Sequence, residues 1–140
     1  MAFKLNGEEP IFDVYMYKFI QKHRYPGPRD ASKWKVDFRT EFDLAEESRN
    51  SNFMEVGCDK YSWNVKRSSD KLEVIGRQNS NDEIIARFDL DKNSRVMHGY
   101  PIDYVTKSAN KPGNEVLKQM RLKEKISKRE LRIIMQGKRV

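Results

Sequence analysis

In the stretch WKVDFRTEFDL, residues 34–44, the polarity of the side chain changes at every position. From Trp34 to Leu44 every second residue is apolar or threonine, and each residue between them is charged. Successive side chains of a β-strand point to opposite faces, so the pattern predicts a strand with one face in the core and one in water. The wet face would carry both signs of charge, which favours cross-strand ion pairs over a metal site at Lys35, Asp37, Arg39, Glu41 and Asp43.

Upstream, residues 8–24 are predicted to form a helix. Ile11, Tyr15 and Phe19 recur at helical spacing, with acidic residues near the front of the segment and basic residues near its end. The proline- and glycine-rich residues 25–28 would end this helix. His23, near its end, is expected to match the helix dipole or to be exposed.

Downstream, short alternating segments predict further strands, joined by turns rich in Ser, Asn and Asp at residues 68–70 and 79–82. The short connections favour an antiparallel meander. Gly99 and Pro101 interrupt the final segment, so we expect it at a sheet edge. The predicted strands lie within residues 53–58, 61–66, 72–74, 84–90 and 96–105.

Residues 114–140 are predicted to form a basic helical C-terminal segment with two short helices. Asn114 can cap the first, and Ser127 with Glu130 forms the Ser-x-x-Glu capping box of the second. Gly137 occupies the position of a C-terminal cap. The expected fold is therefore α+β in a single domain, residues 1–140: an N-terminal helix, a four- to five-stranded antiparallel meander and two short basic C-terminal helices, with the helices on one face of the sheet.

Composition limits where the protein works. The 140 residues fit one domain, and no apolar run approaches the roughly 20 residues of a membrane span. The first residues lack a secretory signal, and Cys58 is the single cysteine. Both features favour a cytoplasmic location, and no membrane partner is expected.

Positive charge gathers at the C-terminal end. Residues 113–140 contain nine basic and three acidic residues, which accounts for most of the net charge of +7. Such asymmetry is typical of proteins that bind a polyanion. The sequence therefore predicts a nucleic-acid-binding protein that contacts phosphates of RNA or DNA through Lys118, Arg121, Lys125, Lys128, Arg129, Arg132, Lys138 and Arg139.

Two alternatives remain open. His98, with Arg87, Arg95 and Tyr100, is a candidate for toxin-like, metal-independent RNA cleavage, because a histidine can transfer protons and an arginine can stabilise charge on phosphate. The basic face could instead hold an acidic protein, which would make the chain an interaction module or inhibitor. Trp34, Tyr61 and Trp63 could stack on bases, although their alternating segments favour core packing.

No cofactor or metal is expected. The chain contains neither a Gly-x-Gly-x-x-Gly nor a Walker pattern, and its two histidines and one cysteine do not have zinc-site spacing. Residues 89–100 begin like a calcium loop, but Ser94 and Tyr100 stand where glycine and glutamate are needed.

Overall fold

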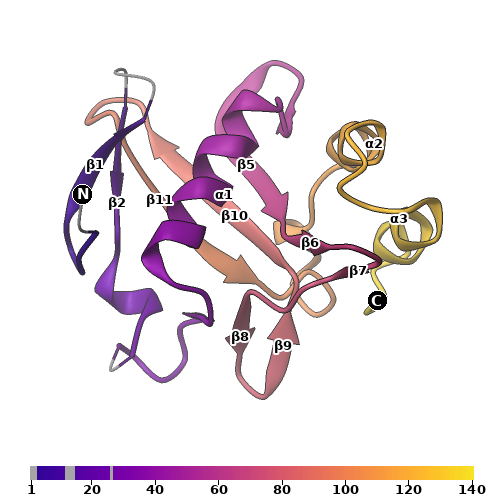
Figure 1. Ribbon diagram of the computed structural model, residues 1–140, viewed down its shortest axis with the longest axis horizontal. Helices are drawn as coiled ribbons and strands as arrows, with labels where there is room; N and C mark the ends of the chain where they lie inside the picture. Colours follow the sequence, from indigo (N-terminus) through magenta and orange to yellow (C-terminus); the bar gives the residue numbers. More distant parts are fainter. Residues whose placement is uncertain (1–2, 12–14, 26) are drawn as a thin grey trace.

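The computed structural model describes residues 3–11, 15–25 and 27–140 (Figure 1). It is a mixed α+β protein in which a large sheet is accompanied by two small ones. The elements in chain order are β1 (Glu8–Ile11), β2 (Tyr15–Lys18), the 3-10 turn η1 (Gln21–His23), β3 (Lys33–Trp34), α1 (Phe38–Asn50), β4 (Met54–Glu55), β5 (Cys58–Val65), β6 (Arg67–Ser68), β7 (Lys71–Leu72), β8 (Gly76–Gln78), β9 (Asn81–Glu83), β10 (Ile85–Asp91), β11 (Val96–Ile102), η2 (Ser108–Asn110), α2 (Asn114–Leu122) and α3 (Lys128–Met135).

The main sheet is mixed rather than an antiparallel meander. Its six strands run in the order β1-β2-β11-β10-β5-β4. β11 pairs parallel with β2 at Val96 and Met97, whereas its pairing with β10 is antiparallel. The prediction of a meander was wrong because the N-terminal segment supplies strands that join the sheet beside the last strand of the chain.

The stretch 34–44 is mainly helical, which contradicts the strand prediction. Only Trp34 belongs to a strand, and α1 begins at Phe38 after Asp37, whose carboxylate accepts a hydrogen bond from the Thr40 amide at 2.8 Å. The cap satisfies an amide that the first helical turn leaves free. Glu41, expected on the wet face, is only 1% exposed. The helix buries one stripe, which also includes Phe42 and Ala45.

The N-terminal segment is a hairpin, so the predicted helix over residues 8–24 was also wrong. β1 pairs antiparallel with β2, and residues 12–14 lie outside the described part of the chain. Tyr17 and Phe19 are buried, whereas Met16, the residue before Tyr17 in β2, is exposed. Pro10 fits β1 because an edge strand can spare a backbone donor.

β11 is an interior strand, not the edge strand expected from its glycine and proline. It lies between β2 and β10. Gly99 packs directly against the ring of Phe88 on β10, and its carbonyl accepts a hydrogen bond from the Trp34 indole at 3.1 Å. The glycine is therefore required by close packing rather than by a sheet edge.

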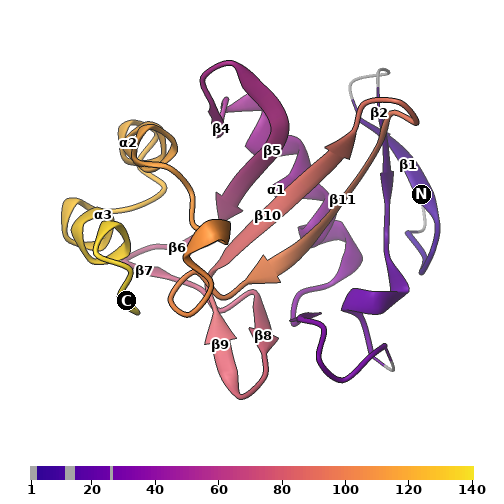
Figure 2. The ribbon, with the colours of Figure 1, turned by 180° about the vertical axis from the view of Figure 1, so that it is seen from behind.

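Helices cover the two faces of the main sheet unequally. α1 lies along one face, where Phe88 and Met97 belong to a buried apolar cluster with Phe42. α2 and α3 lie at one end of the sheet (Figure 2), where they pack against side chains of the opposite face such as Ile85 and Ile102. The expectation that all helices share one face was wrong. The rest of that opposite face is left open by the helices, and its side chains form the candidate site.

The two C-terminal helices confirm their prediction. Ser127 and Glu130 form the capping box, and Gly137 has φ +71 directly after α3. The first helix differs in one detail, because Gly113 rather than Asn114 is its N-cap. No helix in the described ranges is long and apolar enough to cross a membrane.

Candidate functional site

Strand register gathers the polar side chains on the open face. Three neighbouring strands, β5, β10 and β11, align their side chains in rows across the sheet. The first row, under α2 and α3, is apolar. The second and third rows are aromatic, charged and imidazole-bearing. In order, the rows are Val65–Ile85–Ile102, Trp63–Arg87–Tyr100 and Tyr61–Asp89–His98.

Arg87 is the centre of a hydrogen-bonded cluster. Its Nε lies 2.9 Å from Asp89 Oδ1, and its Nη1 donates to Asn110 Oδ1 at 3.1 Å. Its Nη2 donates to the Tyr100 hydroxyl, which in turn donates to Asp89 Oδ2 at 3.1 Å. The guanidinium also lies 4.5 Å from the ring centroid of Tyr61. These contacts fix the direction of the Tyr100 hydroxyl and neutralise the Asp89 carboxylate.

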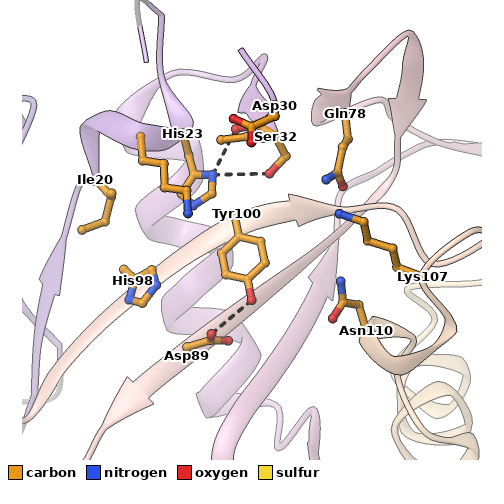
Figure 3. A pocket seen from close by; sticks show the side chains of 12 residues that line it. Ile20, His23, Asp30, Ser32, Gln78, Asp89, His98, Tyr100, Lys107 and Asn110 are labelled. Carbon is orange, nitrogen blue, oxygen red and sulfur yellow. Dashed lines mark hydrogen bonds between the residues drawn. The ribbon is translucent and has the colours of Figure 1, made fainter. Parts of the chain in front are cut away.

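His98 lies where two cavities meet. One cavity, of about 460 Å³, extends from His98 and Tyr100 toward η1 and η2 (Figure 3). The other, of about 620 Å³, extends toward the turn between β10 and β11. Asp89 and His98 line both, so the cavities form one trough along the open face. Burial lowers the pKa of His98, which keeps its ring neutral at pH 7.

His23 enters the same trough from η1. It is 8% exposed, and its ring stacks on Tyr100 with centroids 4.9 Å apart. Its Nδ1 lies 3.0 Å from the Ser32 carbonyl, which can only accept, so Nδ1 carries the proton and Nε2 the lone pair. Burial lowers the pKa of His23 to about 4. The expectation of an exposed histidine at a helix end was therefore wrong.

The tyrosine in the trough remains protonated at neutral pH. Burial, followed by the nearby Asp89 carboxylate, raises the pKa of Tyr100 to about 12. The single hydrogen of this neutral hydroxyl is donated to Asp89 in the structure, so Tyr100 can donate it to a bound group by rotating its O–H bond away from Asp89. The trough therefore combines an acceptor nitrogen on His98 with a donor hydroxyl on Tyr100, with ring centroids 6.1 Å apart.

The aromatic residues divide between core and trough. Trp34 and Trp63 are both buried, which confirms core packing for them. The Trp63 indole donates to the Asn110 carbonyl at 3.0 Å and so anchors η2 beside the site. Tyr61 is half-buried, with the Arg87 guanidinium 4.5 Å and the Lys60 ammonium 5.2 Å from its ring centroid.

Arg95 is not part of this cluster. It lies in the turn between β10 and β11 with φ +59 and is exposed. It lines a different cavity with Tyr15, Asp59 and Lys92. Of the four residues predicted from sequence, the structure thus brings together His98, Arg87 and Tyr100.

The basic residues of the C-terminal segment fall into two groups. Arg139 is bound to the body, since it donates to Glu83 at 2.9 Å and to Asp103 at 3.1 Å. Lys125 forms an ion pair with Glu47. The others are exposed on α2, on α3 or just after it: Lys118, Arg121, Lys128, Arg129, Arg132 and Lys138.

Three residues of the trough were not predicted from the sequence. From the sequence, Asp89 is only the first residue of a rejected calcium loop. His23 is predicted near the end of a helix, which the structure does not contain. Asn110 had no distinguishing pattern at all. Strand alternation from Arg87 to Asp89 could have found the aspartate, whereas His23 and Asn110 reach the site through tertiary contacts alone. Among residues 3–11, 15–25 and 27–140, no three His, Cys, Asp or Glu side chains gather as a metal-binding group.

Comparison of the chain with protein-family models, curated proteins and solved structures finds no match. The geometry of the site itself is therefore the guide to what the protein does.

Proposed function

We propose that the protein cleaves RNA at the trough on the open sheet face, using its own side chains for proton transfer. The observation that carries this proposal is the convergence of His98, His23, Tyr100 and Asp89 in one trough, although they come from separate segments. Arg87 does not line the trough but is hydrogen-bonded to Asp89 and Tyr100. Titratable groups with shifted pKa values gathered in a cavity are typical of catalytic sites.

The chemistry follows from the protonation states. Neutral His98 accepts the proton of a ribose 2′-hydroxyl, and that oxygen attacks the adjacent phosphorus. The bond from phosphorus to the 5′ oxygen breaks, and the leaving oxygen takes the proton of the Tyr100 hydroxyl. The products are a 2′,3′-cyclic phosphate and a free 5′-hydroxyl. Arg87 donates to the Tyr100 oxygen and so stabilises the phenolate that forms.

Positive charge at the rim supports binding of a phosphodiester. Arg87 and Asp89 nearly cancel each other, so the attraction would come from the small excess of Lys22, Lys107 and Lys60 over Asp30 and Asp91 among the residues that line the two cavities. All three lysines are exposed. Phosphate contacts of this kind act mainly through electrostatics and counterion release.

The test is cleavage of a labelled RNA in the presence of EDTA. His98→Ala is expected to reduce the rate by about 100- to 10,000-fold, the usual contribution of a general base. A DNA strand with a single ribose should be cut only after that ribose, and mass spectrometry should find the 2′,3′-cyclic phosphate.

Arg95→Ala is the matched control for this experiment, because Arg95 is exposed and lies outside the trough. Its cleavage rate should equal that of the wild type. Equal RNA cleavage rates for the wild type and a folded His98→Ala variant would contradict the proposal.

A second candidate function is phosphate binding by the exposed faces of α2 and α3. Arg129 and Arg132 are three residues apart and share one side of α3, as do Lys118 and Arg121 on α2. Lys125 and Arg139 form ion pairs with carboxylates of the body, which leaves six of the eight basic residues predicted from the sequence for this surface. An acidic protein would satisfy the same surface.

The paired substitution Arg129→Ala/Arg132→Ala tests this second surface. If α3 contacts phosphates, RNA affinity should fall, and the slope of log K against log salt should decrease by about 1.4, near 0.7 for each lost contact with a single strand. Arg39→Ala, on the exposed side of α1, is the control. An unchanged slope, with retention of a co-purifying acidic protein, would instead favour the interaction module.

A further inference from the structure

A second cavity beside the trough is lined by positive charge. It has a volume of about 630 Å³ and lies next to the first, since Ala31 lines both. Arg29, Lys33 and Arg77 contribute its charged groups, and no acidic residue of the described chain lines it. A cavity with three cations and no lining carboxylate is suited to an anion.

The charge of Lys33 is buried without a carboxylate partner in contact. Lys33 is 4% exposed, and its Nζ donates to the carbonyls of Ala31, at 2.7 Å, and Pro28. Carbonyl oxygens satisfy the hydrogens of the ammonium group but do not cancel its charge. Burial accordingly lowers the pKa of Lys33. Asp30 is close enough to attract the ammonium group but forms no ion pair with it, so an anion in the cavity would supply a countercharge in direct contact.

The two arginines remain available to a ligand. Both are exposed, and the Nε of Arg77 lies 3.7 Å from Asp82, which is the separation of a weak surface pair. Tyr25, on the same cavity wall, is 74% exposed. An exposed aromatic ring next to a cationic surface is the usual platform on which a base of single-stranded nucleic acid stacks.

We infer that this cavity is a phosphate subsite for a nucleotide flanking the cleaved bond, with Tyr25 stacking on the base of that nucleotide. This inference rests on the proposed function and names its substrate class: a single RNA strand of several nucleotides, which extends from the trough past Ala31 into the second cavity. A dinucleotide would occupy the trough alone.

The experiment compares a ribodinucleotide with an oligouridine of roughly 12 nucleotides, within the span of common single-strand sites. The variant Arg29→Ala/Arg77→Ala should lower the preference for the long substrate, measured as the ratio of the two kcat/KM values, by about 10- to 100-fold. In the His98→Ala background, the same two changes should reduce the salt slope of oligouridine binding by about 1.4.

Arg95→Ala, an exposed arginine outside both cavities, should leave the preference and the salt slope as they are. Urea denaturation would show whether the double variant is folded. A folded double variant that keeps the wild-type substrate preference and salt slope would disprove the phosphate subsite, whereas cleavage of the dinucleotide would still support the proposed function. If the wild type cleaves neither substrate, the proposed function fails; the binding slope then still decides whether the cavity holds phosphate.

Discussion

Replacing Glu41 with alanine is expected to destabilise the protein by about 3–5 kcal/mol, the usual cost of breaking a buried ion pair. Glu41 accepts from the Tyr17 hydroxyl at 2.5 Å and from Arg24 Nη2 at 2.7 Å between α1 and the sheet. Removing the carboxylate leaves a largely buried guanidinium and a buried hydroxyl without this acceptor. Urea denaturation at pH 7 would measure the loss.

Asp43→Ala is the matched control, because Asp43 is an acidic residue of the same helix with a half-exposed side chain. Its effect should stay within about 0.5 kcal/mol. Similar losses for both variants would contradict the buried position of Glu41.

The pH dependence of stability provides a second readout of Glu41. Burial raises the pKa of Glu41 to about 7, and burial likewise raises the pKa of Glu83 to about 7. A raised carboxyl pKa favours the folded state below about pH 4.5, and this contribution is lost as the pH rises through 7. The lowered pKa values of His23 and His98 act in the opposite direction below about pH 6.5, so the effect of Glu41 is read from the comparison of two proteins. Between pH 5 and 8, the free energy of unfolding of Glu41→Gln should decrease less, or increase more, than that of the wild type.

Gly99→Ala is expected to cost about 3 kcal/mol, at the upper end of typical overpacking penalties. A Cβ atom at this position would meet the ring of Phe88, 2.5 Å from Cε1 and closer still to Cδ1. Phe88 is fully buried between Trp34 and Tyr17 and cannot move aside freely. Because Gly99 separates His98 from Tyr100, RNA cleavage should decline as well.

A double-mutant cycle isolates this clash. Phe88→Leu shortens the ring side chain, so adding Gly99→Ala to Phe88→Leu should cost less than adding it to the wild type. Strictly additive losses would show that Phe88 is not the obstacle. Urea midpoints of the four proteins are the measurement.

The sequence predicts the second half of the fold better than the first. Strands near 61–65 and 85–90, and both C-terminal helices, follow from local alternation and capping. The two large errors share one cause: positions four apart lie on the same side of both a helix and a strand. Phe38 and Phe42 fit either pattern, as do Tyr15 and Phe19, and only tertiary packing decides between them.

The candidate site could be predicted in part for a similar reason. His98, Arg87 and Tyr100 lie on two adjacent strands, where alternation and pairing are local properties. Arg95 was included because it is close in sequence, but the turn carries it away from the trough. His23 and Asn110 arrive from distant segments, so no local pattern could assign them.

The parallel pairing of β2 with β11 has a consequence for folding during synthesis. Synthesis proceeds from the N-terminus, so some eighty further residues must be added after β2 before its neighbour β11 is available for pairing. His23 follows β2 directly, whereas His98 and Asn110 emerge late. A nascent chain therefore cannot assemble this site before Asn110 has emerged, and any RNA-cleaving activity would begin only after that point of synthesis.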